Sequence, residues 1–308
     1  MGTPEFAVPS LRSLQKSGFD VAAVVTAPDK PAGRGRKISS SPVKQYALRN
    51  GLTLLQPERL RDPAFVKTLS DIKADIFVVV AFRMLPEEVW SIPTLGTFNL
   101  HASLLPQYRG AAPVNHAIIN GETRTGVTTF LIDKEIDTGK ILLAKPTDIL
   151  PDENAGSLHD RLMVMGAELV VETTKRLYEG TVKPVSQKTE PGVVLNAAPK
   201  IFPADTIINW RDPAVKVYNR IRGLSPYPGA VTTLRREDQS LRIKIYEGRV
   251  RDDVITIPGT IISESRANLT ICCSSGAIEI LSLQPEGRKR MTSAEFLRGF
   301  DTDGWEPA

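Results

Sequence analysis

The sequence predicts an α/β protein with a doubly wound, mostly parallel sheet, followed by a small C-terminal β-barrel. Two apolar, β-branched runs at residues 21–26 and 74–81 have the composition of strands that are buried on both faces. Helical patterns alternate with these runs, which favours parallel strands joined by crossover helices. After residue 230 the pattern changes to short alternating strands separated by turn residues, which is typical of a barrel.

In the first part we expect helices at residues 4–16, 42–50 and 63–72, and further strands at 96–101, 126–132 and 141–149. The longest helix is expected to run from Asn154, a suitable N-cap, to Gly180, a suitable residue just past a helix end. In a sheet of this kind, ligands bind outside the carboxyl ends of the strands.

The chain is long enough for two domains, with 308 residues of which 41% are apolar and 24% charged. We predict a catalytic domain at residues 1–181 and a connector at 182–203, where proline, lysine and small residues follow no clear period. Residues 204–308 are expected to form a barrel of oligonucleotide-binding (OB) type, and a sandwich fragment would have a similar pattern. Its strands are expected at residues 231–235, 241–246, 259–263, 269–273 and 278–283.

Composition argues against several classes of protein. The two cysteines, Cys272 and Cys273, are adjacent in an apolar stretch, so neither a disulfide framework nor a cysteine metal site is expected. We find no HExxH pair and no Walker lysine loop, and we expect no metal. No apolar run approaches the roughly 20 residues that span a bilayer, and no signal peptide opens the chain. We therefore expect a cytoplasmic protein that does not bind a membrane.

Positive charge is concentrated in one segment, although the net charge is only +4. Within residues 29–49 only Asp29 opposes the basic side chains, which are Lys30, Arg34, Arg36, Lys37, Lys44 and Arg49. A solvated loop and a nucleic-acid contact explain this charge equally well on sequence alone.

The stretch TFNLHASLLPQYRGAAP, residues 97–113, has the clearest chemical character. Side chains alternate along a strand, so Asn99 and His101 share one face at the carboxyl end of the predicted strand. Asp137 lies in a predicted turn between two later strands. An amide, an imidazole and a carboxylate in one cleft suit acyl-type transfer, because the first two can stabilise an oxyanion. A structural histidine and an ordinary turn aspartate are the competing interpretation, and we treat His116 and His159 as structural.

With these residues in view, the chain resembles the methionyl-tRNA formyltransferase family over nearly its whole length. Four segments carry the resemblance: GTPEFAVPSL at the start, PDKPAGRGRKISSSPVK at 28–44, NLHASLLPQYRGAAP at 99–113, and DTGKIL at 137–142. The NxHxSLLP core is shared by the wider superfamily that uses 10-formyltetrahydrofolate, whereas the first two segments resemble the subgroup that formylates initiator tRNA.

The resemblance implies transfer of a formyl group from 10-formyltetrahydrofolate, the co-substrate, to the α-amino group of initiator methionyl-tRNA. It places the catalytic trio on Asn99, His101 and Asp137, and it implies no metal. The family's folate-contacting loop matches Ser103, Leu104, Leu105 and Pro106. Its tRNA-contacting loop matches Arg34, with Arg36, Lys37 and Lys44 available for phosphates. We expect the barrel to add electrostatic contacts to tRNA, and we expect a monomer.

Two other functions stay open at this point. A sister formyltransferase acting on an amino sugar nucleotide or glycinamide ribonucleotide would share NLHASLLP but would have no reason to keep PAGRGRK. A non-catalytic tRNA-binding protein would have no reason to keep Asn99, His101 and Asp137 together.

The opening residues MGTPEF predict a turn with no strand before it. In the family Gly-Thr-Pro follows the first strand, which is central in the sheet, so we expect a longer natural protein in which Met1 is internal. Loss of that strand would leave buried backbone groups unpaired, at about 1–3 kcal/mol each. This expectation also leaves organellar targeting open for a protein that otherwise looks bacterial and cytoplasmic.

Overall fold

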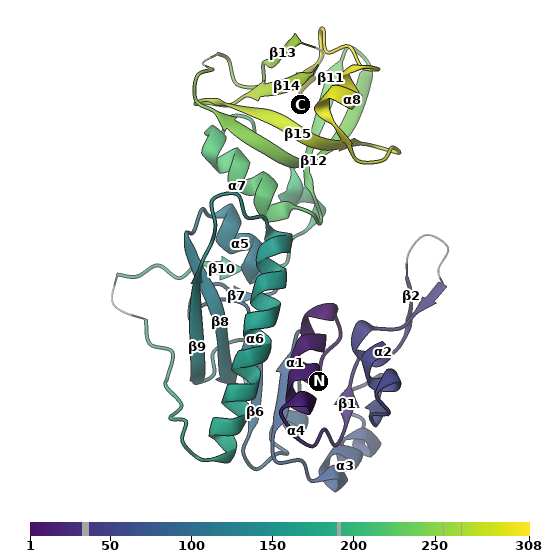
Figure 1. Cartoon of the computed structure of the whole chain (residues 1–308), viewed down its shortest axis with the longest axis vertical. Coiled ribbons are helices and arrows are strands. Elements are labelled where there is room, and N and C mark those ends of the chain that lie inside the picture. The colour runs from purple at the N-terminus through teal and green to yellow at the C-terminus, as the bar shows by residue number, and fades with distance from the viewer. Residues whose placement is uncertain (33–36, 190–191, 255, 266) are drawn as a thin grey trace. The chain divides into compact units, whose positions relative to one another are not determined.

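The computed structural model describes residues 1–32, 37–189, 192–254, 256–265 and 267–308 (Figure 1). The chain forms two compact units. The first contains Met1–Gly110, Arg124–Asp148 and His159–Ala197. The second contains Ala111–Thr123, Ile149–Leu158 and Ala198–Ala308. No helix in the described residues is long and apolar enough to cross a membrane.

The strand that contains Asn99 and His101, residues 97–101, lies inside the sheet of the first unit. Four strands pair in the order β5-β6-β8-β9, and β1 pairs with β4. The bounds are β1 Val24–Val25, β4 Leu54–Leu55, β5 Phe77–Val80, β6 Thr97–His101, β8 Arg124–Leu131 and β9 Ile141–Asp148.

Strand direction changes across this sheet. The pairs β1–β4 and β5–β6 are parallel, as the alternation of strands and helices predicts. In contrast, β8 is antiparallel to both β6 and β9. Only residues 132–140 join β8 to β9, which is a hairpin connection too short for a crossover helix. The doubly wound fold is therefore confirmed, with parallel pairing confined to its first half.

The helices of the first unit begin where the sequence places caps and prolines. Ser41 and Asp62 accept hydrogen bonds from the first turns of α2 and α3, and each is followed by proline at the first helical position. The bounds are η1 Glu5–Ala7, α1 Val8–Lys16, α2 Pro42–Arg49, α3 Pro63–Ile72, α4 Glu87–Trp90 and α6 Ala155–Tyr178. The short strands β2 Lys30–Ala32 and β3 Lys37–Ser39 pair with each other, as do β7 Arg109–Gly110 and β10 Ala197–Ala198.

Packing on α6 fixes which face of β6 is available for chemistry. Leu100 lies against Gly166 of α6, where a Cβ would come within 2.6 Å of the leucine side chain. Only glycine permits this approach. Because side chains alternate along a strand, Asn99 and His101 belong to the face opposite Leu100.

The first two residues occupy the position between β1 and β5. The Gly2 N–H donates to Val25 O at 3.0 Å, Val80 N–H donates to Met1 O at 2.9 Å, and the Met1 amine donates to Val78 O at 2.7 Å. A cavity of about 590 Å³ adjoins them, lined by residues 21–25 and 74–78 among others.

The second unit is built around an antiparallel, barrel-like sheet. Its strands pair in the order β13-β14-β15-β12-β11-β17, and β16 adds to β15. The bounds are β11 Ala230–Arg236, β12 Gln239–Arg251, β13 Ile261–Ser265, β14 Asn268–Cys272, β15 Ala277–Pro285, β16 Met291–Thr292 and β17 Glu306–Pro307. Its helices are α5 Pro113–Ile119, η2 Pro203–Thr206, α7 Ala214–Leu224 and α8 Ser293–Leu297.

The core of this unit lies between the sheet and α7. Val217, Ile221 and Leu224 of α7 are buried in one cluster with Ile245 and Ile278. The five strands expected from sequence correspond to β11 through β15, and the barrel-like C-terminal fold is confirmed.

Candidate active site

Strand β6 presents Asn99 and His101 from one face, as the alternation predicts. His101 is buried, with 6% of its surface exposed, and its ring lies 6.5 Å from that of Phe130 in an edge-on arrangement. Asn99 is partly exposed, and within the described part of the chain its side chain has no hydrogen-bond partner. The Asn99 amide is therefore available to bind a substrate atom on the same face of the strand as the His101 ring.

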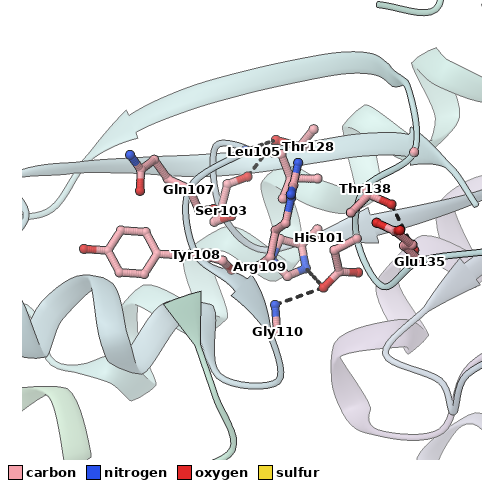
Figure 2. Close-up of polar contacts among 12 residues, drawn as sticks. His101, Ser103, Leu105, Gln107, Tyr108, Arg109, Gly110, Thr128, Glu135 and Thr138 are labelled. Carbon is pink, nitrogen blue, oxygen red and sulfur yellow. Dashed lines mark hydrogen bonds and ion pairs between the residues drawn. The ribbon is translucent and has the colours of Figure 1, made fainter. Parts of the chain in front are cut away.

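The partners of His101 fix the tautomer of its ring. Its Nε2 lies 2.8 Å from the carbonyl oxygen of Tyr108. A carbonyl oxygen only accepts, so Nε2 carries hydrogen and donates. Its Nδ1 faces Asp137 Oδ2 at 3.8 Å, a distance too long for a hydrogen bond but short enough for an ion pair (Figure 2). The neutral ring therefore carries its hydrogen on Nε2, and Nδ1 is the nitrogen next to the carboxylate.

Asp137 reaches His101 from the turn that joins β8 to β9. The Asp137 side chain is mostly buried, and its Oδ2 accepts a hydrogen bond from the Gly110 N–H at 3.0 Å. Its backbone has φ +57, in the left-handed region. Gly139 closes the turn, where a Cβ would lie 1.6 Å from Leu131 O. The structure therefore brings the predicted histidine and aspartate together.

The loop after β6 is fixed by hydrogen bonds of the Thr128 and Ser103 hydroxyl groups. Thr128 of β8 donates from Oγ1 to Ser103 O at 2.7 Å and accepts from the Leu105 N–H at 3.2 Å. Ser103 donates its hydroxyl to Gln107 O at 2.6 Å, so this side chain serves the loop and is 1% exposed. Leu105 is buried, whereas Leu104 and Pro106 are partly exposed.

The predicted tRNA residues are only partly visible in the structure. Arg34 and Arg36 lie outside the described residues, and of Lys37 only the backbone is described, in β3. Lys44, on α2, pairs through Nζ with Asp29 Oδ2 at 2.5 Å. The hydrogen bond from Lys44, followed by one from Gln56, lowers the pKa of Asp29. Two of the four residues thus have described positions, and no phosphate contact is tested.

Three groups near the site were not found by sequence reasoning. They are the Tyr108 carbonyl, the Gly110 N–H and the Thr128 hydroxyl. Two are backbone groups, which leave no mark in residue type, and a threonine in a strand is common. Tyr108 and Gly110 lie within the 97–113 stretch, which is the only sequence signal for them, and Thr128 has none. No cluster of three or more metal-binding side chains is present among the residues that the structure describes.

Comparisons with known proteins identify the family of the chain. Residues 1–174 match a family described as formyl transferase, and residues 200–301 match its C-terminal domain. A methionyl-tRNA formyltransferase of Bacteroides thetaiotaomicron is 50% identical over 311 residues, which cover 99% of this chain and 96% of that protein. One from Flavobacterium johnsoniae is 49% identical over 299 residues, covering 97% and 94%.

Solved structures of the same fold include an N-formyltransferase from Helicobacter canadensis in complex with folinic acid and dTDP-3-aminofucose. It has a TM-score of 0.64 and 21% identity, and the match covers 91% of this chain and 96% of that one. A glycinamide ribonucleotide transformylase from Symbiobacterium toebii has a TM-score of 0.52 and 17% identity, covering 60% and 92%. These likenesses show the fold. The family match and the near relatives together show that the chain belongs to the formyl transferase family.

Proposed function

We propose that this chain is a methionyl-tRNA formyltransferase, which transfers the formyl group of 10-formyltetrahydrofolate to the α-amino group of initiator methionyl-tRNA. The observation that carries the proposal is 50% identity with a methionyl-tRNA formyltransferase over 99% of the chain. The structural neighbour in complex with an amino sugar nucleotide is 21% identical. The acceptor is therefore assigned from the near relatives rather than from the shared fold.

The mechanism uses the trio on β6 and the 132–140 turn. The free α-amine attacks the formyl carbon, and a tetrahedral intermediate with an oxyanion forms. The Asn99 amide and the protonated Nδ1 of His101 donate to this oxyanion. At 3.8 Å from Asp137 Oδ2, Nδ1–H makes no direct hydrogen bond to the carboxylate and is available to the substrate, while the carboxylate balances the charge on the ring.

Collapse of the intermediate breaks the bond between the formyl carbon and N10. The proton that the attacking amine loses passes by way of the Asp137 carboxylate to N10, so the leaving group departs neutral. Atoms and charge balance without a metal or a redox partner. Removal of one oxyanion donor is expected to cost about 3 kcal/mol in the transition state.

The folate and the tRNA are assigned to two different segments of the first unit. The loop of Ser103, Leu104, Leu105 and Pro106 contacts the folate, with the partly exposed Leu104 and Pro106 nearest to solvent. Arg34, Arg36, Lys37 and Lys44 contact the tRNA backbone, since cations supply most of the affinity for phosphates.

The division of labour follows the domain boundaries expected from sequence. Residues 1–181 perform formyl transfer, and 204–308 add electrostatic contacts to tRNA. The structural units differ from these boundaries, because residues 111–123 and 149–158 belong to the second unit and residues 182–197 belong to the first rather than to a separate connector. The enzyme acts as a monomer in the cytoplasm, where initiator tRNA is charged. Size-exclusion chromatography with light scattering, in the presence and absence of tRNA, tests the monomer.

One assay separates the proposal from its rivals. We would measure kcat/KM for formyl transfer from 10-formyltetrahydrofolate to methionyl-tRNA, glycinamide ribonucleotide and an amino sugar nucleotide. The proposal predicts turnover with methionyl-tRNA far above that with either small acceptor. Turnover with a small amine alone would instead identify a sister formyltransferase. Tight tRNA binding with no turnover on any acceptor would identify a non-catalytic binding protein.

A further inference from the structure

The turn that carries Asp137 needs support from outside itself. Asp137 has φ +57, a conformation that residues with a Cβ adopt rarely. Within the turn, Thr138 donates from Oγ1 to Asp133 Oδ1 at 2.8 Å, and Glu135 N–H donates to the same oxygen at 3.1 Å. These bonds hold residues 133–138, but neither touches the Asp137 backbone.

Gln187 supplies that support from a segment distant in sequence. Its Nε2 donates to Asp137 O at 2.9 Å and to Gly139 O at 2.8 Å. The amide thus holds the carbonyl groups on both sides of Thr138. Because carbonyl oxygens only accept hydrogen bonds, they require the nitrogen of Gln187 at this position.

Arg109 completes the arrangement from the other side. Its Nε and Nη2 donate to Gln187 Oε1 at 3.1 and 2.6 Å. A guanidinium has no acceptor, so it requires the oxygen of Gln187 at this position. All four hydrogen-bonding positions of the amide are therefore used, and its orientation is determined by its partners. Gly110, the next residue after Arg109, donates to the Asp137 carboxylate.

We propose that Gln187 is a positioning residue for formyl transfer. Together with Arg109 it fixes the backbone on both sides of the Asp137 turn, so that Asp137 Oδ2 faces His101 Nδ1. The inference rests on the proposed function, because it assumes that Asp137 takes part in the reaction. It goes beyond the trio in that it assigns a kinetic role to a side chain of the predicted connector.

The role of the Gln187 side chain can be tested separately from the backbone contacts that attach its segment. Two backbone hydrogen bonds, both 2.8 Å long, join Val185 and Ile141 in an isolated bridge. This bridge does not depend on the side chain at position 187. A variant at Gln187 should therefore leave the segment attached and disturb chiefly the Asp137 turn.

Three variants test the proposal by the kinetics of formyl transfer to methionyl-tRNA. Gln187→Ala removes all four hydrogen bonds, and Gln187→Glu keeps the size and the pairing with Arg109 but cannot donate to the carbonyl groups. We expect both to lower kcat by about 10- to 100-fold with KM changed less than about threefold, as for a misplacement near 1 Å. Ser186→Ala, at the exposed neighbouring position, is the matched control and should keep wild-type kcat.

A double-mutant cycle distinguishes positioning from a general structural role. If Gln187 acts through Asp137, Gln187→Ala should lower kcat less than about twofold in an Asp137→Asn background. Additive losses would overturn the proposal, as would wild-type kcat in Gln187→Glu.

Hydrogen exchange gives a second measurement that needs no activity. The Gly110 amide, which donates to Asp137 Oδ2, should exchange at least about tenfold faster in Gln187→Ala than in wild type or Ser186→Ala. Unchanged exchange would refute the positioning role. If wild-type protein formylates no acceptor, the proposed function fails, and the exchange rates still decide whether Gln187 holds the turn.

Discussion

Replacement of Thr128 by valine tests how far the 103–107 loop depends on a single hydroxyl. Thr128 is fully buried, with 0% of its surface exposed. Its Oγ1 donates to Ser103 O and accepts from the Leu105 N–H. Valine has nearly the same shape but no hydroxyl, so Thr128→Val removes both hydrogen bonds without opening a large cavity.

The magnitude follows from the two backbone groups that lose their partner. A buried polar group left without a hydrogen bond costs about 1–3 kcal/mol, so the free energy of unfolding should fall by about 2–6 kcal/mol. Relaxation of the loop places our expectation near the lower end, about 3 kcal/mol, which a protein of ordinary stability survives. If about 1.4 kcal/mol of the lost free energy had stabilised the loop conformation that binds folate, the KM for folate rises about tenfold.

The assay combines urea unfolding with KM measurement for 10-formyltetrahydrofolate. Thr125→Val is the matched control, because Thr125 is buried in the same strand at 3% exposure and makes no side-chain hydrogen bond within the described residues. The control should lose little stability and keep the wild-type KM. Equal effects of the two substitutions on stability and on KM would refute the role assigned to Thr128.

Two further predictions concern the site and the basic segment. Asn99→Ala should lower kcat at least about 100-fold, since one oxyanion donor is lost, with tRNA affinity unchanged by filter binding. Lys44→Ala should reduce the slope of log affinity for tRNA against log salt by about one, whereas Lys67→Ala, which breaks an exposed pair with Asp71, should not.

The elements with strong local patterns were predictable from sequence. The helix α3, at Pro63–Ile72, has the predicted bounds, and α6 lies within the predicted span between Asn154 and Gly180. The common face of Asn99 and His101 follows from the two-residue period of a strand, which needs no knowledge of the rest of the fold. From the residues alone Asp137 was a turn aspartate that could reach the cleft of Asn99 and His101, and the family resemblance supported this placement.

Other features were not predictable because they depend on contacts between distant segments. Gln187 lies 50 residues from Asp137 in a segment without a periodic pattern, so sequence reasoning treated it as part of a connector. The tautomer of His101 is set by the Tyr108 carbonyl, a backbone group present at every position. Likewise, the left-handed conformations of Tyr108 and Asp137, with φ +60 and +57, occur without glycine and leave no compositional signal.

The central claim is that the trio of Asn99, His101 and Asp137 transfers a formyl group to methionyl-tRNA. Its most direct test is single-turnover transfer of a labelled formyl group from 10-formyltetrahydrofolate to methionyl-tRNA, with wild-type enzyme and His101→Ala at saturating substrates. We expect label on the methionine amine with wild type and a rate at least about 100-fold lower with the variant. Equal rates of label transfer by the two proteins would contradict it.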